Sequence, residues 1–348
     1  MAYAIEIRNQ EEARQCLEGV GSSPAGIEYM VPKAVFRCIM IKDIQSRAAN
    51  LLKQEMLAKG GEAAVAKNAA AGEGNSDVLL MGTLKQYRLL TKKLKLQPFG
   101  LKQVAADIEI ILNAREHPPV TMELANGKTL TFGQRTLIMG ILNITPDSFS
   151  DGGRYFDPEQ AVKHALEMKA AGADIIDLGG ASSRPDSQMA GAEEELARLL
   201  PVIRKLARED LILSVDTFRA EVARQMLNEG AHLINDIGGL QMDPDMTEVL
   251  VKQQAPAVIM HNRLQMNQGQ PYQDLIADIT SELRTSMEKA AAAGLPKEKL
   301  IIDPGIGFGK TPAENRLIIK RLHAFKSLGR PVLLGASRKR FIGATLDL

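Results

Sequence analysis

The stretch Leu137 to Gly153, LIMGILNITPDSFSDGG, decides the expected fold, because an apolar run ends at Asn143 and passes directly into a loop rich in hydroxyl, carboxylate and glycine residues. A strand of a parallel barrel delivers polar residues to the barrel mouth in this way. Further short apolar runs follow along the chain. The seven expected strands span residues 136–145, 173–180, 211–217, 232–237, 255–261, 299–305 and 331–337.

Longer amphipathic segments separate these runs, a pattern typical of βα units around a parallel sheet. The segments 158–173, 192–209 and 272–294 are each long enough for a crossover helix. The expected strands end in polar residues or glycine, at Asn143, Gly179, Asp216, Asn235, His261, Asp303 and Ser337. In a (β/α)8 TIM barrel, all of these ends face one mouth. We therefore predict an α/β fold of this type.

Only seven of the eight strands of such a barrel are expected, because the chain stops at Leu348, about one turn into a helix expected near Arg338. The C-terminal part thus lacks the last strand and helix. At 348 residues the chain exceeds the ~250 residues of one barrel, which predicts a second domain. We place the barrel at residues 119–348 and a smaller α/β domain of unknown role at residues 1–118.

A β-hairpin is expected over residues 120–132, since Asn126-Gly127 is a strong turn signal between alternating strands. We expect this hairpin to close the floor of the barrel. In the N-terminal domain, residues 4–8 and 34–41 are strand-like, and residues 44–61 and 100–115 are helical in pattern. None of these segments carries a motif with evident chemistry.

The charge balance excludes large polyanionic partners. Lys and Arg total 43 against 42 acidic residues, for a formal charge of +1, so no basic field exists to hold nucleic acid or an acidic membrane surface. The N-terminus has no signal-peptide pattern and no run approaches the ~20 apolar residues of a membrane span, which predicts a cytoplasmic protein. The two cysteines, Cys16 and Cys38, are expected to be buried thiols.

Three strand ends carry amide or carboxylate side chains, in the strings VDT, IND and IDPG. Asp216, Asn235 and Asp303 would meet at the barrel mouth. A carboxylate can bind the paired N–H groups of a guanine-like ring edge, and an Asn amide supplies both a donor and an acceptor. Taken singly, each residue could equally cap the following helix. The combination favours a site for a ring of this kind.

The later motifs contain glycine and cations. The string GIGFGKT is not a phosphate loop, because Pro304 stands where that pattern requires glycine. In GASRKR (335–340), cations near a helix N-terminus oppose the helix dipole, so an anion or a π-rich ligand would explain their position. A lone strand-end histidine, His261, is more often structural, since no second metal ligand is spaced nearby.

These strings, together with GGASSRPDS (179–187) and VIMHNR (258–263), resemble the signatures of the dihydropteroate synthases in the same order, over roughly residues 120–348. The second loop departs from the family pattern, because Ala181 replaces Glu and Asp186 replaces Gly. The Glu replacement weakens any acid role in that loop. The resemblance implies condensation of 6-hydroxymethyl-7,8-dihydropterin diphosphate with p-aminobenzoate to give 7,8-dihydropteroate and diphosphate in folate biosynthesis, by an enzyme that is a sulfonamide target.

The resemblance also implies a role for individual residues. The pterin would be bound by Asp216, Asn235, Ile237, Met260, Asp303, Gly307, Phe308 and Lys339. The p-aminobenzoate would be bound by Thr145, Pro146, Phe149, Ser183, Pro185, Ser337 and Arg338. Catalysis would depend on Asp216, Asp303, Lys339 and Arg184, where the Arg184 guanidinium suits a diphosphate. Asn143 would bind Mg2+, whose other ligands are diphosphate oxygens and water. His261 remains a candidate behind these residues.

Two other functions stay open at this point. One is a pterin- or methyltetrahydrofolate-binding methyltransferase on a similar barrel, which would not be expected to have the TPDSF loop or the SRK string. The other is a non-catalytic pterin-binding protein, suggested by Ala181, the N-terminal domain and the absent eighth strand. The family resemblance also implies a homodimer, although the C-terminal helices that usually contribute are missing.

Overall fold

The computed structural model describes residues 2–144, 157–180, 191–266 and 271–346. The chain divides into two compact units, Met1–His117 and Pro118–Leu348, and each is described by itself. Among the described helices, none has both the length and the apolar character that crossing a bilayer requires.

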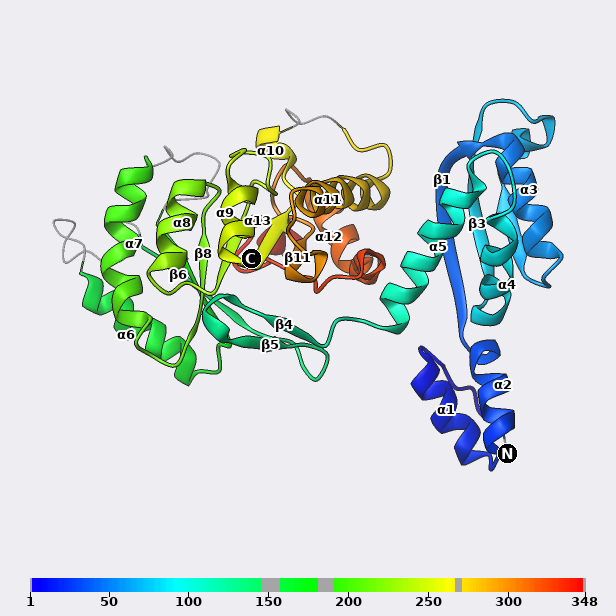
Figure 1. Ribbon diagram of the computed structural model, residues 1–348, viewed down its shortest axis with the longest axis horizontal. Helices are drawn as coiled ribbons and strands as arrows, with labels where there is room; N and C mark the ends of the chain where they lie inside the picture. The colour runs from blue at the N-terminus through cyan, green and yellow to red at the C-terminus, as the bar shows by residue number, and fades with distance from the viewer. Residues whose placement is uncertain (1, 145–156, 181–190, 267–270, 347–348) are drawn as a thin grey trace. The chain divides into compact units, whose positions relative to one another are not determined.

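The C-terminal unit contains a parallel sheet of six strands in the order β11-β10-β9-β8-β7-β6, so that strands adjacent in sequence are adjacent in space (Figure 1). The strands are β6 (Met139–Asn143), β7 (Ile175–Gly179), β8 (Ile212–Asp216), β9 (Leu233–Asp236), β10 (Ala257–Met260) and β11 (Leu300–Asp303). Each lies within an expected strand range, which confirms the first six. This sequential parallel order is that of βα units in a barrel wall.

The seventh expected strand, 331–337, is wrong in extent. Val332 forms only an isolated parallel bridge with Ile302, supported by hydrogen bonds from Ile302 N to Pro331 O (3.0 Å) and from Leu333 N to Ile302 O (2.8 Å). Just beyond, Ala336 N donates to Leu334 O at 3.2 Å, and this tight turn removes the backbone from the ladder. The described wall therefore consists of six strands and one bridge rather than seven strands.

Helices follow the strands and pack on the outer face of the sheet. The longer ones are α6 (Pro158–Ala170), α7 (Ala192–Leu206), α8 (Ala220–Asn228), α9 (Met246–Gln253), α11 (Leu275–Ala292) and α12 (Pro312–Lys320), with short α10 (Arg263–Met266) and α13 (Arg340–Leu346). Local sequence sets their starts. In α12, Thr311 and Glu314 form a capping box and Pro312 occupies the first turn.

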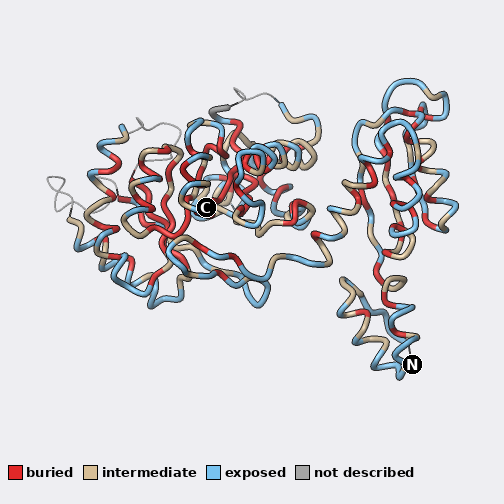
Figure 2. The backbone as a smooth tube through the Cα atoms, viewed as in Figure 1, coloured by how far each residue is buried: buried red, intermediate tan, exposed pale blue. Residues whose placement is uncertain are grey.

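Side chains along each strand point alternately into an outer core, beneath the helices, and an inner core. Outward side chains such as Leu213 and Ile259 are fully buried with the helices, and β7 to β11 are mostly buried, whereas the edge strand β6 is partly exposed (Figure 2). At the amino-terminal ends, inward side chains such as Ile175 and Leu233 instead cluster with Met122, Leu124 and Leu130 of the hairpin.

The hairpin itself pairs β4 (Thr121–Glu123) with β5 (Thr129–Thr131). Asn126 and Gly127 both have positive φ, 58° and 80°, as the turn signal predicts. The hairpin and its place in the inner core are confirmed. Because its apolar residues fill the inside of the amino-terminal end, the inward positions at the opposite end can be polar.

The N-terminal unit has an antiparallel sheet in the order β1-β3-β2, formed by β1 (Phe36–Gln45), β2 (Glu62–Val65) and β3 (Asn75–Thr83). Its core includes Leu52, Leu80, Tyr87 and Ile108. The helices are α1 (Gln10–Gly19), α2 (Pro24–Ala34), α3 (Ser46–Leu57), α4 (Leu84–Leu94) and α5 (Leu101–Glu116).

Two expectations for this unit are wrong. Residues 4–8 form no strand in the described chain; Ile5 is 60% exposed and finds no ladder partner. The cysteines are not buried thiols, because Cys16 is half-buried and Cys38 is exposed on β1. The strand predicted over 34–41 and the helices predicted over 44–61 and 100–115 are present as β1, α3 and α5.

Truncating the outer core should destabilise the C-terminal unit. Leu213→Ala removes a fully buried side chain and leaves a cavity, so we expect a loss of about 2–5 kcal/mol in the free energy of unfolding. Leu317→Ala, at a side chain that is 40% exposed, should change it by no more than about 0.5 kcal/mol. Urea denaturation followed by circular dichroism measures both; equal losses would contradict this packing.

Candidate active site

Four of the expected strand ends lie in one register row. Asn143 pairs with Gly179, Gly179 with Asp216, and Asp216 with Asn235, across β6, β7, β8 and β9. Side chains that share a register row point to the same face of a sheet. Each of these positions lies an even number of residues beyond the inward apolar residue at the start of its strand, four in β6, β7 and β8 and two in β9. The row therefore lies on the inner face at the carboxyl end.

Gly179 leaves space between two of these side chains. A Cβ atom added there would lie 3.6 Å from Asn143 Oδ1 and 3.7 Å from Asp216 Oδ2. The amide of Asn143 and the carboxylate of Asp216 therefore converge over the glycine, as the sequence predicts for residues that serve one site.

An acidic residue missed by the sequence analysis lies behind the row. Asp177, on the inner face of β7, is 5% exposed and accepts a hydrogen bond from Asn235 Nδ2 at 2.9 Å. This contact fixes the orientation of the Asn235 amide and leaves its oxygen for a ligand. A carboxylate inside an otherwise apolar run, ADIIDLGG, is the signal that could have identified Asp177.

Burial raises the pKa of the acids in this region. The pKa of Asp216 lies well above its ordinary value because of burial, reinforced by the nearby carboxyls of Asp177, Glu195 and Asp236, while the Lys339 charge opposes the rise. Burial likewise raises the pKa of Glu195, which pairs with Arg219 at 2.9 Å. Such clusters of raised carboxyl pKa values are typical of functional sites.

Asp303 and Met260 are register partners on β11 and β10, and both are buried. Asp303 Oδ1 accepts the backbone N–H of Gly305 at 2.7 Å. Burial raises the pKa of Asp303 to about 6, against the effects of the Gly305 hydrogen bond and the charges of Lys310 and Lys339. The structure thus places Asp303 at the same end of the sheet as Asp216 and Asn235.

The loop after β11 meets the predicted SRK lysine. The Lys339 ammonium lies 4.3 Å from the centre of the Phe308 ring, and the Lys339 stem passes Gly307, where an added Cβ would come within 3.1 Å of Lys339 Cδ. Burial lowers the pKa of Lys339, and the charges of Asp303 and Asp216 raise it. Lys339, Gly307 and Phe308 therefore lie together, within electrostatic reach of both aspartates.

A second lysine of this loop, Lys310, was also missed. Its ammonium lies 3.0 Å from His261 Nδ1, and burial lowers its pKa to about 7. His261 is 3% exposed, which agrees with a residue behind the ligand-facing side chains. Asp236, the other acid missed here, accepts the backbone N–H groups of Gly238 and Leu240, each at 2.7 Å.

Part of the predicted p-aminobenzoate site, together with the predicted catalytic residue Arg184, lies outside the described residues. Thr145, Pro146 and Phe149, and likewise Ser183, Arg184 and Pro185, fall in 145–156 and 181–190. Of the described members, Ser337 and Arg338 are exposed, and Arg338 has a φ of 51°. Ile237, the remaining pterin candidate, is half-buried just after β9.

Asn143 is exposed at the end of β6 and presents an amide oxygen. The described residues contain no cluster of three His, Cys, Asp or Glu side chains able to hold a metal ion. A single oxygen ligand nevertheless fits Mg2+, which keeps most of its water and binds through one or two protein groups plus phosphate oxygens.

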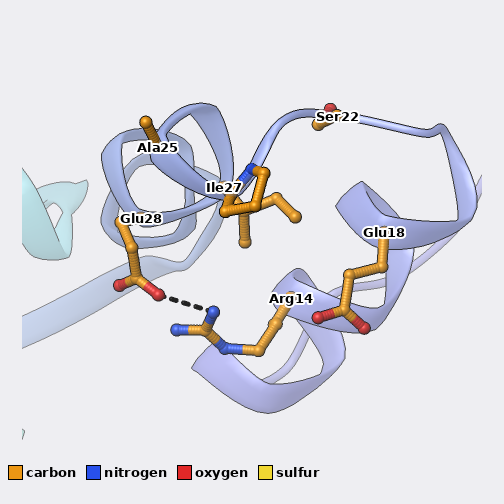
Figure 3. A pocket seen from close by; sticks show the side chains of 7 residues that line it. Arg14, Glu18, Ser22, Ala25, Ile27 and Glu28 are labelled. Carbon is orange, nitrogen blue, oxygen red and sulfur yellow. Dashed lines mark ion pairs between the residues drawn. The ribbon is translucent and has the colours of Figure 1, made fainter.

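A hollow in the N-terminal unit, between α1 and α2, is a different kind of site (Figure 3). It is lined by Arg14, Glu18, Ser22, Pro24, Ala25, Ile27 and Glu28. Arg14 and Glu28 are paired across it at 2.6 Å. This ion pair joins partly exposed side chains, and the residues that line the hollow include no group of reactive side chains comparable to that of the sheet edge.

Comparisons with known proteins place the C-terminal unit in a family. The family model of the pterin binding enzymes matches residues 139–348. The dihydropteroate synthase of Bacillus subtilis is 47% identical over 63% of this chain and 76% of its own length. A dihydropteroate synthase structure from Xanthomonas albilineans in complex with 7,8-dihydropteroate is 40% identical, covering 65% of this chain and 81% of that one, with a TM-score of 0.59.

A longer relative also matches the N-terminal unit. The probable bifunctional folylpolyglutamate synthase/dihydropteroate synthase of Halobacterium salinarum is 40% identical over 97% of this chain. The chain spans only 41% of the length of that relative.

Gly305 should be the least replaceable glycine of the loop. Its φ is 71°, and a Cβ there would lie 1.9 Å from the His261 carbonyl oxygen, a backbone atom that cannot rotate away. We expect Gly305→Ala to lower the free energy of unfolding by ~1–3 kcal/mol more than Gly172→Ala. Gly172 also has positive φ, 103°, but open space around it. Equal losses in urea denaturation would refute the close approach.

Proposed function

Because this chain belongs to the pterin binding enzyme family, with dihydropteroate synthases among its relatives, we propose that it catalyses the synthesis of 7,8-dihydropteroate. The substrates are 6-hydroxymethyl-7,8-dihydropterin diphosphate and p-aminobenzoate. One observation carries the proposal: Asp216, Asn235 and Asp303 lie on the inner carboxyl edge of the sheet, and Lys339 acts electrostatically on both aspartates.

The ring edge of the pterin is complementary to these groups. Asp303 keeps acceptor capacity beyond its bond to Gly305, and the Asn235 amide is oriented by Asp177. Met260, Ile237 and Gly307 would line the ring, and Phe308 would lie beside it under the Lys339 ammonium. Unpaired carboxylates in a buried site select strongly for a ligand that supplies N–H groups.

The reaction breaks the bond between the pterin methylene carbon and the diphosphate oxygen and forms a bond to the p-aminobenzoate nitrogen, which then loses a proton. Positive charge develops on the pterin as the diphosphate leaves. Asp216 and Asp303 would oppose that charge in a poorly hydrated pocket, where electrostatic effects are large. The pKa of Asp216 is raised in the ligand-free site, and the positive charge that develops on the pterin would favour the ionised form of this carboxyl.

The leaving diphosphate gains negative charge, which cations near it would stabilise. Arg184 would bind it through paired N–H donors, and Asn143 would supply one ligand to Mg2+. When bound, Mg2+ neutralises charge on the diphosphate. The amine of p-aminobenzoate is itself the nucleophile, so the chain need not supply an activated one. Thr145, Pro146, Phe149, Ser183, Pro185, Ser337 and Arg338 would form its pocket.

We propose that the chemistry takes place in residues 119–348 and that the protein assembles as a homodimer. The Bacillus subtilis synthase aligns with only 63% of this chain, which supports an N-terminal domain, residues 1–118, that the condensation does not require. Its role is a separate matter.

The activity is tested by incubating the 348-residue chain with dihydropterin diphosphate, Mg2+ and p-aminobenzoate, with and without a sulfonamide. We expect sulfonamide-sensitive release of diphosphate together with dihydropteroate. Asp216→Asn should lower kcat/KM about 100-fold by removing the charge. The control Asp210→Asn, at a side chain that is 93% exposed, should leave it unchanged. Pterin binding without condensation would instead favour the non-catalytic or methyltransferase function.

The affinity for the pterin should depend on pH. Since the pKa of Asp303 is about 6, the group gains a proton as the pH falls through 6 and loses acceptor capacity for the ring. Calorimetric titration with a pterin that lacks the diphosphate should therefore show weaker binding at pH 5 than at pH 7. Asp303→Asn should bind weakly at both values. Equal affinity of the unsubstituted chain at pH 5 and 7 would contradict this role.

A further inference from the structure

We propose that Lys310 is a positioning residue of the pterin site, which holds the loop 305–309 against the end of β10 and so places Phe308, Gly307 and Asp303. The inference rests on the proposed function. The Lys310 ammonium lies within hydrogen-bond distance of four acceptors: the carbonyl oxygens of Gly305 (2.9 Å), Phe308 (3.0 Å) and His261 (3.3 Å), and His261 Nδ1 (3.0 Å).

These contacts use the whole donor capacity of the side chain. An ammonium group has three N–H donors, and here four acceptors compete for them. Lys310 therefore has no donor left for a substrate. It can influence the reaction only through its charge and through the groups that it holds, two of which are carbonyls of the glycine-rich loop.

His261, the side-chain partner of Lys310, has a charged neighbour of its own. Because His261 Nδ1 faces the ammonium, it is the acceptor nitrogen, and the proton of the neutral ring resides on Nε2, which lies 3.0 Å from Glu282 Oε2. Arg263 Nε donates to the other oxygen of Glu282 at 3.0 Å. His261 thus lies between Lys310 and Glu282 of α11, a carboxylate that Arg263 of α10 orients, and Lys310 connects this group to the loop.

Asn315 of α12 also binds the backbone of this loop through its side chain. Its Oδ1 accepts the N–H of Gly307 at 2.9 Å, and its Nδ2 donates to Lys310 O at 3.2 Å and Thr311 O at 3.0 Å. Asn315 is 2% exposed. The loop between β11 and α12 is therefore bound at Gly305, Gly307, Phe308 and Lys310, and the Phe308 ring is set beneath Lys339.

Lys310 also acts on Asp303 through its charge, which lowers the pKa of that carboxyl. The charged groups that face Lys310 come from every packed element: Asp303 of β11, Glu282 of α11, Glu314 of α12 and Arg263 of α10, besides His261. Lys339 is the second cation that lowers the pKa of Asp303. Removing the Lys310 charge should move the pKa of Asp303 upward, so this carboxyl is protonated at higher pH.

The test compares Lys310→Met, which keeps the length of the side chain but removes its charge and donors, with Lys310→Arg, which keeps both. The control is Lys320→Met, at an exposed residue at the end of α12. The full chain is titrated calorimetrically, between pH 5 and 8, with a pterin that lacks the diphosphate. Steady-state kcat and KM for dihydropterin diphosphate are measured alongside.

For Lys310→Met we expect weaker pterin binding and a higher KM for the pterin, by up to about 100-fold, because a displacement of the loop by ~1 Å is enough for such a loss. The acid limb of the binding profile should shift to higher pH. Lys310→Arg should restore the position of the limb, and Lys320→Met should match the unsubstituted chain.

A role limited to fold stability would lower the melting temperature and leave the affinity and the pH limb of the folded protein unchanged; that result would overturn the inference. If Lys310→Met does not fold, Lys310→Gln, which retains two N–H donors but no charge, replaces it. We expect the acid limb of its pterin-binding profile to shift to higher pH as well. Failure of the unsubstituted chain to bind the pterin would overturn the proposed function, and the inference with it. Normal binding by every Lys310 variant would overturn the inference alone.

Discussion

The burial of carboxyl groups at one edge of a parallel sheet is the constraint on which the site depends. Asp177, Asp216 and Asp303 all come from inward positions of the strands, where Asp177 and Asp303 are buried and Asp216 is half-buried. An ionised carboxylate in such a place must be compensated, or it retains its proton. Asp303 receives one backbone N–H and the influence of two lysines, whereas Asp216 is crowded by further acids and its pKa rises well above the ordinary value. A ligand that brings N–H groups or positive charge relieves this imbalance, which gives binding and transition-state stabilisation the same physical origin.

The backbone of the loop after β11 is the second determinant. A side chain at Gly305 would collide with the His261 carbonyl, so the loop can approach β10 only because that position lacks a Cβ atom. Close approach brings three carbonyl oxygens to one ammonium, and it aligns the Gly307 N–H with a buried amide of α12. Backbone geometry, rather than the chemistry of any one side chain, thus determines where the aromatic ring of Phe308 and the Lys339 ammonium meet.

The sequence predicts features that follow from residue patterns, such as strands and strand ends. It does not predict features that depend on contacts between distant residues. Near-continuous apolar runs identify β6 to β11, and their polar ends identify Asp216, Asn235 and Asp303, because strand alternation and parallel order translate directly into position. The run 331–337 has the same composition, yet a turn at Leu334 and Ala336 ends its pairing after Leu333. Asp177 and Lys310 were missed by the sequence analysis. An acid within an apolar strand and a lysine in a glycine loop are visible in the sequence, but their roles depend on partners distant in sequence, Asn235 and His261. The exposure of Cys38 likewise depends on which face of β1 is covered.

The two lysines near Asp303, Lys339 and Lys310, have different roles, and their contacts distinguish them. Lys339 passes the open space at Gly307 and ends over an aromatic face, which stabilises a cation without saturating its N–H donors. Lys310 is surrounded by carbonyl oxygens and an imidazole nitrogen. A cation bound in this way contributes its charge to the pocket but occupies no carboxylate oxygen. If both lysines formed direct ion pairs with the aspartates, the acceptors that a pterin edge requires would be consumed inside the protein. Because carbonyl oxygens rather than a carboxylate bind the Lys310 ammonium, Asp303 experiences its charge and still presents an oxygen to the ligand.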